Sequence, residues 1–149
     1  MRRLALCALL LCLAAAQAPA SGLFLSAERH GAYRPALDAL TGAILDHGYT
    51  PIKIQPVDEG LRLKGYRSSD YKLIFFGSKA QVDEVLAVYP EAAVMLPLKV
   101  ILYRKGESVI ATTPRLEMWK EVFHSDALDQ LIDVWQSDLT AILQQFSSR

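Results

Sequence analysis

The sequence is poor in cysteine, and both cysteines lie close to the N-terminus. Cys7 and Cys12 are the only two among 149 residues. Both fall in a segment that we expect to be removed, which leaves a chain without thiols. That excludes a disulfide framework, a zinc–thiolate site and covalent haem attachment through two cysteines. A chain of this length can bury roughly two-thirds of its unfolded surface, so it folds without disulfides.

An excess of charge of either sign is also missing. The chain has 16 basic and 16 acidic side chains, a formal net charge of +0. Losing Arg2 and Arg3 leaves 14 basic against 16 acidic, a formal net charge of −2. Neither a nucleic acid nor an anionic membrane surface is therefore indicated as a partner.

No serine stands in a nucleophile elbow and no glycine cluster forms a phosphate loop, so we expect no cofactor, while catalysis stays open.

The first twenty residues have the order of a secretory signal peptide. Basic residues at positions 2 and 3 precede an apolar run over residues 4–16, and small residues follow. The run is too short for a membrane span, which needs roughly 20 residues. Ala18 and Ala20 fit a signal-peptidase pocket, so we expect cleavage after Ala20, with a cut before Gln17 as the alternative. The sequence thus predicts a periplasmic or secreted protein without a membrane anchor after cleavage.

Residues 21–149 are expected to form one domain. Apolar residues at three- and four-residue spacing predict helices, and short alternating or apolar runs predict strands. The expected helices cover residues 34–47, 58–64, 78–90, a turn beginning at Thr113-Pro114, and a long C-terminal stretch from Ser125 or Asp126. The expected strands cover residues 23–27, 50–57, 71–76, 94–96, 100–103 and 108–112.

Two local signals refine these expectations. Ser78 and Gln81 form a capping box at a helix start. Prolines at both limits of the strand over residues 50–57 place its ends at an edge or a bulge. Strands joined partly by hairpins and partly by helices predict an α+β fold: a two-layer sandwich with a mostly antiparallel or mixed sheet and helices packed on one face.

Several segments resemble a known bacterial family. They are the strand and turn over residues 71–78, Tyr89-Pro90, and the Leu-Pro-Leu-Lys stretch within residues 95–103, with support from residues 47–50, 57–61 and Thr113-Pro114. Together, over residues 36–118, they resemble "domain of unknown function 302". The resemblance implies a small α+β domain and no established reaction. Many members look as though they carry a cysteine where this chain has Gly77-Ser78, so no thiol-based role is implied here.

One segment concentrates positive charge. Residues 62–72 hold four basic side chains, two tyrosines and one acid. Cations interleaved with aromatic rings can hold an anion or a partner surface. The alternative is a solvated connector before the strand at residue 71. We therefore predict ligand or partner binding at Arg62, Lys64, Tyr66, Arg67, Tyr71 and Lys72.

A metal site is not expected. His30, His47 and His124 are far apart in sequence, although they could form a soft-ligand set with Met95 and Met118. Met95 lies in an apolar run typical of a core, and His47 lies in the last turn of a helix, where a positive charge interacts favourably with the helix dipole.

The sequence also places Asp126, Asp129, Asp133 and Asp138 on one helix, where we expect a solvated face.

Two functions fit these observations. The first is a non-catalytic binding or assembly module, compatible with a homo-oligomer, with Trp119, Phe123 and Trp135 as aromatic anchors for a protein partner. The second is a small-molecule-binding enzyme or carrier with a cleft near residues 58–72, where an anionic ligand would bind. A polar cleft would favour the second, and an exposed apolar patch the first.

Overall fold

A computed structural model describes residues 22–148. The expected signal peptide, its cleavage site, and Cys7 and Cys12 lie outside the described residues. Within residues 22–148, no helix is both long and apolar enough to cross a membrane.

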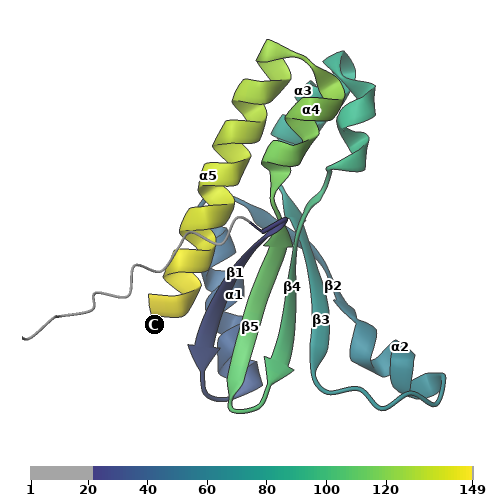
Figure 1. Ribbon diagram of the computed structural model, residues 1–149, viewed down its shortest axis with the longest axis vertical. Coiled ribbons are helices and arrows are strands. Elements are labelled where there is room, and N and C mark those ends of the chain that lie inside the picture. The colour runs from purple at the N-terminus through teal and green to yellow at the C-terminus, as the bar shows by residue number, and fades with distance from the viewer. Residues whose placement is uncertain (1–21, 149) are drawn as a thin grey trace, which may run out of the picture.

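The described residues form one antiparallel sheet of five strands (Figure 1). In spatial order these are β1 (Phe24–His30), β5 (Ser108–Pro114), β4 (Leu98–Lys105), β3 (Tyr71–Gly77) and β2 (Thr50–Pro56). Every neighbouring pair is antiparallel, and β1 and β2 are the edges. The hairpin between β4 and β5 turns at Gly106, whose positive φ of 59° suits glycine.

Helices cover one face of this sheet. α1 (Tyr33–Asp46) and α5 (Asp126–Ser148) pack against each other and against the strands, and α1 lies behind the sheet in Figure 1. α2 (Val57–Leu63) lies at the end of the sheet where β2 ends and β3 begins. The short helices gather at the opposite end, and they are α3 (Lys79–Val88), η1 (Pro90–Val94), η2 (Leu116–Trp119) and α4 (Lys120–Phe123). The predicted α+β fold with helices on one face is confirmed.

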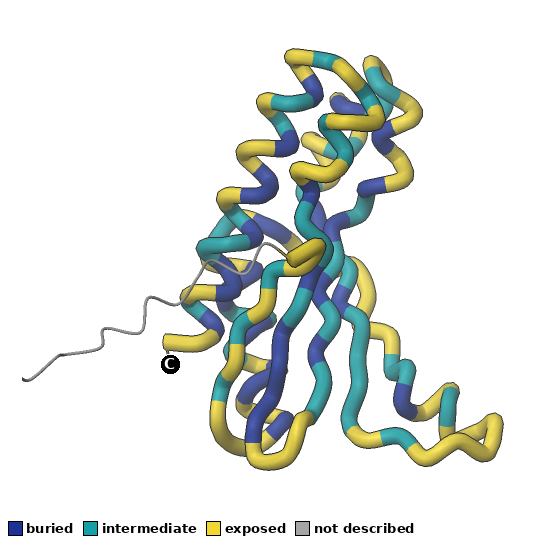
Figure 2. The backbone as a smooth tube through the Cα atoms, viewed as in Figure 1, coloured by how far each residue is buried: buried dark blue, intermediate teal, exposed yellow. Residues whose placement is uncertain are grey.

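The core lies between the sheet and its helices (Figure 2). Alternate residues of the central strands point inward, among them Ile74, Val100 and Leu102. The long apolar stripe of α5 is buried as predicted, with only Leu131 of the expected set partly exposed. Trp135 belongs to this stripe and is 2% exposed. The expectation that Trp135 anchors a partner is therefore wrong, because its ring is already packed inside the domain.

Most predicted elements are confirmed, with three corrections. The strand expected at residues 94–96 is wrong, because the 3₁₀ helix η1 ends at Val94 and Met95 is its C-cap. Thr113-Pro114 does not start a helix: β5 continues through both residues, and the Thr113 hydroxyl donates to the carbonyl of Lys99 at 2.7 Å. Ser78 is the N-cap of α3, but its side chain makes no capping hydrogen bond. At Thr113-Pro114, pairing of β5 with β1 overrides the local signal for a helix start.

β2 lies at an edge of the sheet, as the prolines at its two limits predict. Its pairing with β3 slips between Pro51 and Lys53, as a bulge does. Ile52 and Ile54 are both exposed, at 62% and 40%. The strand is therefore less buried than its alternating pattern predicts.

Candidate functional sites

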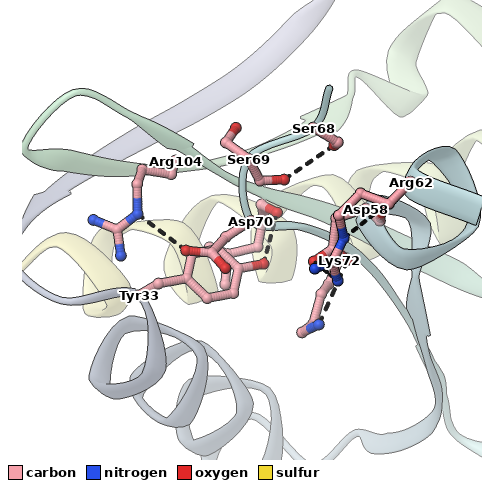
Figure 3. Close-up of polar contacts among 9 residues, drawn as sticks. Tyr33, Asp58, Arg62, Ser68, Ser69, Asp70, Lys72 and Arg104 are labelled. Atoms are coloured by element: carbon pink, nitrogen blue, oxygen red, sulfur yellow. Dashed lines mark hydrogen bonds and ion pairs between the residues drawn. The ribbon is translucent and has the colours of Figure 1, made fainter. Parts of the chain in front are cut away.

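Asp58 is the buried centre of a polar cluster at the junction of α2 and β3 (Figure 3). Its carboxylate lies 3.7 Å from Lys72 Nζ and 3.9 Å from Arg62 Nη2. The side chain is only 9% exposed, and Oδ1 has no hydrogen-bond partner within the described residues. Two cations thus compensate one buried carboxylate, which fixes α2 against the sheet.

Tyr33 and Arg104 form the second half of this cluster. Arg104 Nε donates to Asp70 Oδ2 at 3.0 Å, and its guanidinium lies 5.9 Å from the centre of the Tyr33 ring. The Tyr33 hydroxyl donates to the carbonyl of Leu102 at 3.0 Å. Burial, together with the nearby charges of Asp58 and Asp70, raises the pKa of Tyr33 well above its ordinary value. Tyr33 therefore stays a neutral hydrogen-bond donor at physiological pH.

The structure does not gather the six predicted site residues into one place. Arg62 and Lys72 meet at Asp58, on the helix-covered side of the sheet. Tyr71 comes directly before Lys72 in β3 and points to the other face of the sheet. The remaining three, Lys64, Tyr66 and Arg67, are exposed in the connector before β3. The segment thus divides into a paired cluster, a solvated connector and one residue of the open sheet face.

The open face of the sheet is the larger feature, and its residues follow from strand register. One row across the strands reads Ser26, Thr112, Ile101, Leu73 and Gln55. The next row reads Glu28, Ile110, Tyr103 and Tyr71, and in the row on the other side Phe75 pairs with Lys99 and Lys53. The edge strands are polar in these rows, while the central strands carry mostly aliphatic and aromatic side chains.

A hollow occupies the middle of the open face. Its volume is about 590 Å³, and Tyr71, Tyr103 and Ile101 line it together with Phe24. Hydroxyl groups supply its polar lining, from Ser26, Thr112 and the connector residues Ser68 and Ser69. Ser26 and Thr112 hydrogen-bond each other at 2.8 Å. None of the eight lining residues is charged, so the hollow suits a neutral, partly apolar surface.

The histidines lie at three different element ends. His30 Nδ1 bonds the Ser108 hydroxyl at 3.0 Å, His47 Nδ1 bonds the Ala43 carbonyl at 2.9 Å, and His124 ends α4 with a left-handed backbone. Met95 is in the core as predicted and lines the same pocket as Met118. Among residues 22–148, no group of three or more histidine, cysteine or acidic side chains is placed to hold a metal ion.

The acidic residues of α5 are more engaged than a solvated face requires. Asp138 accepts a hydrogen bond of 2.6 Å from the Tyr49 hydroxyl. Asp133 pairs with Lys120 at 2.6 Å, and this hydrogen bond raises the pKa of Lys120. These contacts tie α5 to α4 and to the segment that follows α1.

Sequence reasoning missed the open face, although a signal was present. In β3 and β4, residues on both sides of the alternation are apolar: Leu73 and Phe75 beside Ile74, and Ile101 beside Val100. A strand of a one-sided antiparallel sheet should alternate apolar with polar residues. The excess of apolar residues therefore indicates that the second face of the sheet is also apolar.

Comparisons with known proteins agree with this fold. The family model described as "Domain of unknown function DUF302" matches residues 27–146. Among solved structures, the uncharacterized conserved protein DUF302 from Bacillus stearothermophilus matches with a TM-score of 0.76 and 17% sequence identity. The match covers 83% of this chain and 97% of that chain. No curated protein matches the sequence.

Proposed function

Because this chain belongs to the family of the domain of unknown function DUF302, whose description names no activity, we propose its function from geometry: a non-catalytic assembly module. The surface that it uses is the open face of the sheet. The observation that carries this proposal is that most outward side chains on the three central strands are apolar.

Contact of an apolar sheet face with water is energetically unfavourable. Within residues 22–148, no helix covers the side of the sheet that carries Leu73, Phe75 and Ile101, and each of these apolar side chains is partly exposed. Antiparallel sheets with one solvated face carry polar residues there. Contiguous apolar patches on monomers mark binding surfaces, because leaving them in water costs roughly 25 cal/mol per Å².

A second copy of this chain is the partner that fits this face. The hollow has no charged lining, and depletion of charge at the centre is typical of homodimer interfaces. After the expected cleavage, 14 basic and 16 acidic side chains leave a formal net charge of −2, which is small enough for two copies to repel each other only weakly. Two sheets stacked about 10 Å apart would enclose both apolar faces and leave the helices outside.

The alternative of an enzyme or carrier with a cleft near residues 58–72 has weaker support. Arg62 and Lys72 are engaged by Asp58, and Arg104 is engaged by Asp70. An incoming anion would have to compete with carboxylates already in place.

Sedimentation velocity over a range of protein concentrations tests the proposal. The wild type should sediment as a dimer, and Ile101→Glu should be monomeric because it places a charge at the centre of the interface. Val134→Glu is the matched control, since Val134 is exposed on α5. Both variants should keep the wild-type circular dichroism spectrum. A wild type that stays monomeric at every concentration, or an Ile101→Glu protein that remains dimeric, contradicts the proposal.

Export to the periplasm or to the medium is part of the same proposal. It is supported by the basic, apolar and small-residue order of residues 1–20.

A further inference from the structure

A second pocket lies beside η1 and η2, separate from the open-face hollow except for Phe24. Its volume is about 290 Å³, near the lower end of the range for small-molecule sites. Its lining residues extend from Leu23 to Leu139 and include members of six elements: β1, η1, β4, β5, η2 and α5. Such a site exists only in the folded domain.

The pocket has a buried floor and an exposed apolar rim. Met95, Leu116 and Leu139 are at most 6% exposed and belong to the floor. Val94 and Met118 on the rim are 54% and 46% exposed. Apolar side chains around an apolar hollow gain free energy when a ligand displaces the water next to them. Met118 is also adaptable, because its unbranched side chain fits ligands of different shape.

Lys99 supplies the only charge among the lining residues. No ion pair within residues 22–148 involves Lys99. The other polar lining residue is Thr113, whose hydroxyl already donates to the carbonyl of Lys99. The lining therefore combines apolar side chains with one lysine, which matches an apolar body with a single negative charge.

We propose that this pocket binds a small amphipathic monoanion, namely a carboxylate with an aliphatic or aromatic body. The carboxylate pairs with the ammonium group of Lys99, and the apolar body lies on the floor formed by Met95, Leu116 and Leu139. Dianionic phosphates are disfavoured because one cation compensates only half of their charge. The pocket shares Lys99 and Phe24 with the margin of the open sheet face, and it adds ligand binding to the function of the domain.

Methionine methyl groups offer a direct probe. The chain has three methionines, and the two in the described residues, Met95 and Met118, both line the pocket. In protein labelled with ¹³C at the methionine methyls, titration with octanoate should shift both signals. Octanol, which lacks the charge, should bind at least fivefold more weakly, and acetate, which lacks the apolar body, should shift neither signal.

Three variants test the role of the charge. Lys99→Gln should weaken octanoate binding about tenfold and leave octanol binding unchanged. Val94→Asp adds a negative charge to the exposed rim and should weaken octanoate binding in the same way. Lys105→Gln is the matched control, because Lys105 is an exposed lysine at the other end of β4.

Three results would overturn the inference: no methionine shift with octanoate at millimolar concentration, equal binding of octanol, or unchanged octanoate binding by Lys99→Gln. The sedimentation of each variant is measured in parallel. A failure of ligand binding in a protein that still forms dimers refutes this site alone and leaves the assembly proposal standing.

Discussion

Replacing Tyr49 by Phe removes one hydrogen bond and leaves its ring packing intact. Tyr49 is 4% exposed, and its hydroxyl donates to Asp138 Oδ2 at 2.6 Å. Its ring also meets the Phe76 ring edge-on at a centroid distance of 5.6 Å. One side chain thus joins α5, the sheet and the turn after α1.

The cost of Tyr49→Phe follows from the partner's charge and exposure. Hydrogen bonds to charged groups contribute about 1.5–3 kcal/mol. Asp138 is partly exposed, so water replaces part of the lost bond, and we expect destabilisation by about 1.5 kcal/mol. Urea unfolding at pH 7 measures this difference. Combining Tyr49→Phe with Asp138→Ala in a double-mutant cycle should give a coupling of about 1 kcal/mol.

The pH dependence gives an independent check. Burial and the bond to Asp138 raise the pKa of Tyr49 above its ordinary value of 10.0. The protonated phenol is therefore favoured by folding, and this stabilisation is complete below pH 10 and is lost as the pH rises further. The difference in unfolding free energy between wild type and Tyr49→Phe should shrink above pH 10. Equal stabilities at pH 7, or a difference that grows with pH, would refute the reasoning.

Three further predictions concern the core, the N-terminus and the basic connector. Trp135→Ala should lower the unfolding free energy by about 3–5 kcal/mol in urea titrations, because it opens a cavity under α5, and a loss below 1 kcal/mol would mean that the helix is peripheral. Intact-mass analysis of the exported protein should show cleavage after Ala20, and a mass that retains residues 1–20 would end that prediction. Replacing Lys64 and Arg67 together by Gln should weaken anion binding by residues 62–72, while melting stays close to wild type because both charges are exposed and add little stability. Unchanged binding of every anion found would leave that segment a solvated connector.

Sequence patterns predicted the elements well where local physics decides. The apolar stripe of α5 has a period that only a helix satisfies, and Gly48 ends α1 with a φ of 80°, as a left-handed cap requires. Thr113 and Pro114 show where local patterns fail, because the same dipeptide can start a helix or end a strand. Pairing with β1 decided between them, and no local signal reports that pairing.

The candidate sites were harder to predict because they depend on which residues meet across the fold. The charge of residues 62–72 was visible in the sequence, and Asp58 stands four residues before Arg62 on one predicted helix, a spacing that pairs opposite charges. No spacing linked Asp58 to Lys72, which meets it only across the fold. The outward apolar residues of β3 and β4 could have been recognised from their lack of alternation. Only the arrangement of helices shows which of the two apolar faces is left open.

A distance between two copies tests the central claim most directly. Ile101 lies at the middle of the open face, so in a two-fold sheet-on-sheet dimer the two Ile101 positions come close, across a sheet spacing of about 10 Å. Spin labels on the single-cysteine variant Ile101→Cys, prepared from residues 22–148, should show strong dipolar coupling between copies. Labels on Val134→Cys, on the exposed side of α5, should lie much farther apart. Absent coupling at position 101, or stronger coupling at 134 than at 101, would contradict assembly through the open sheet face.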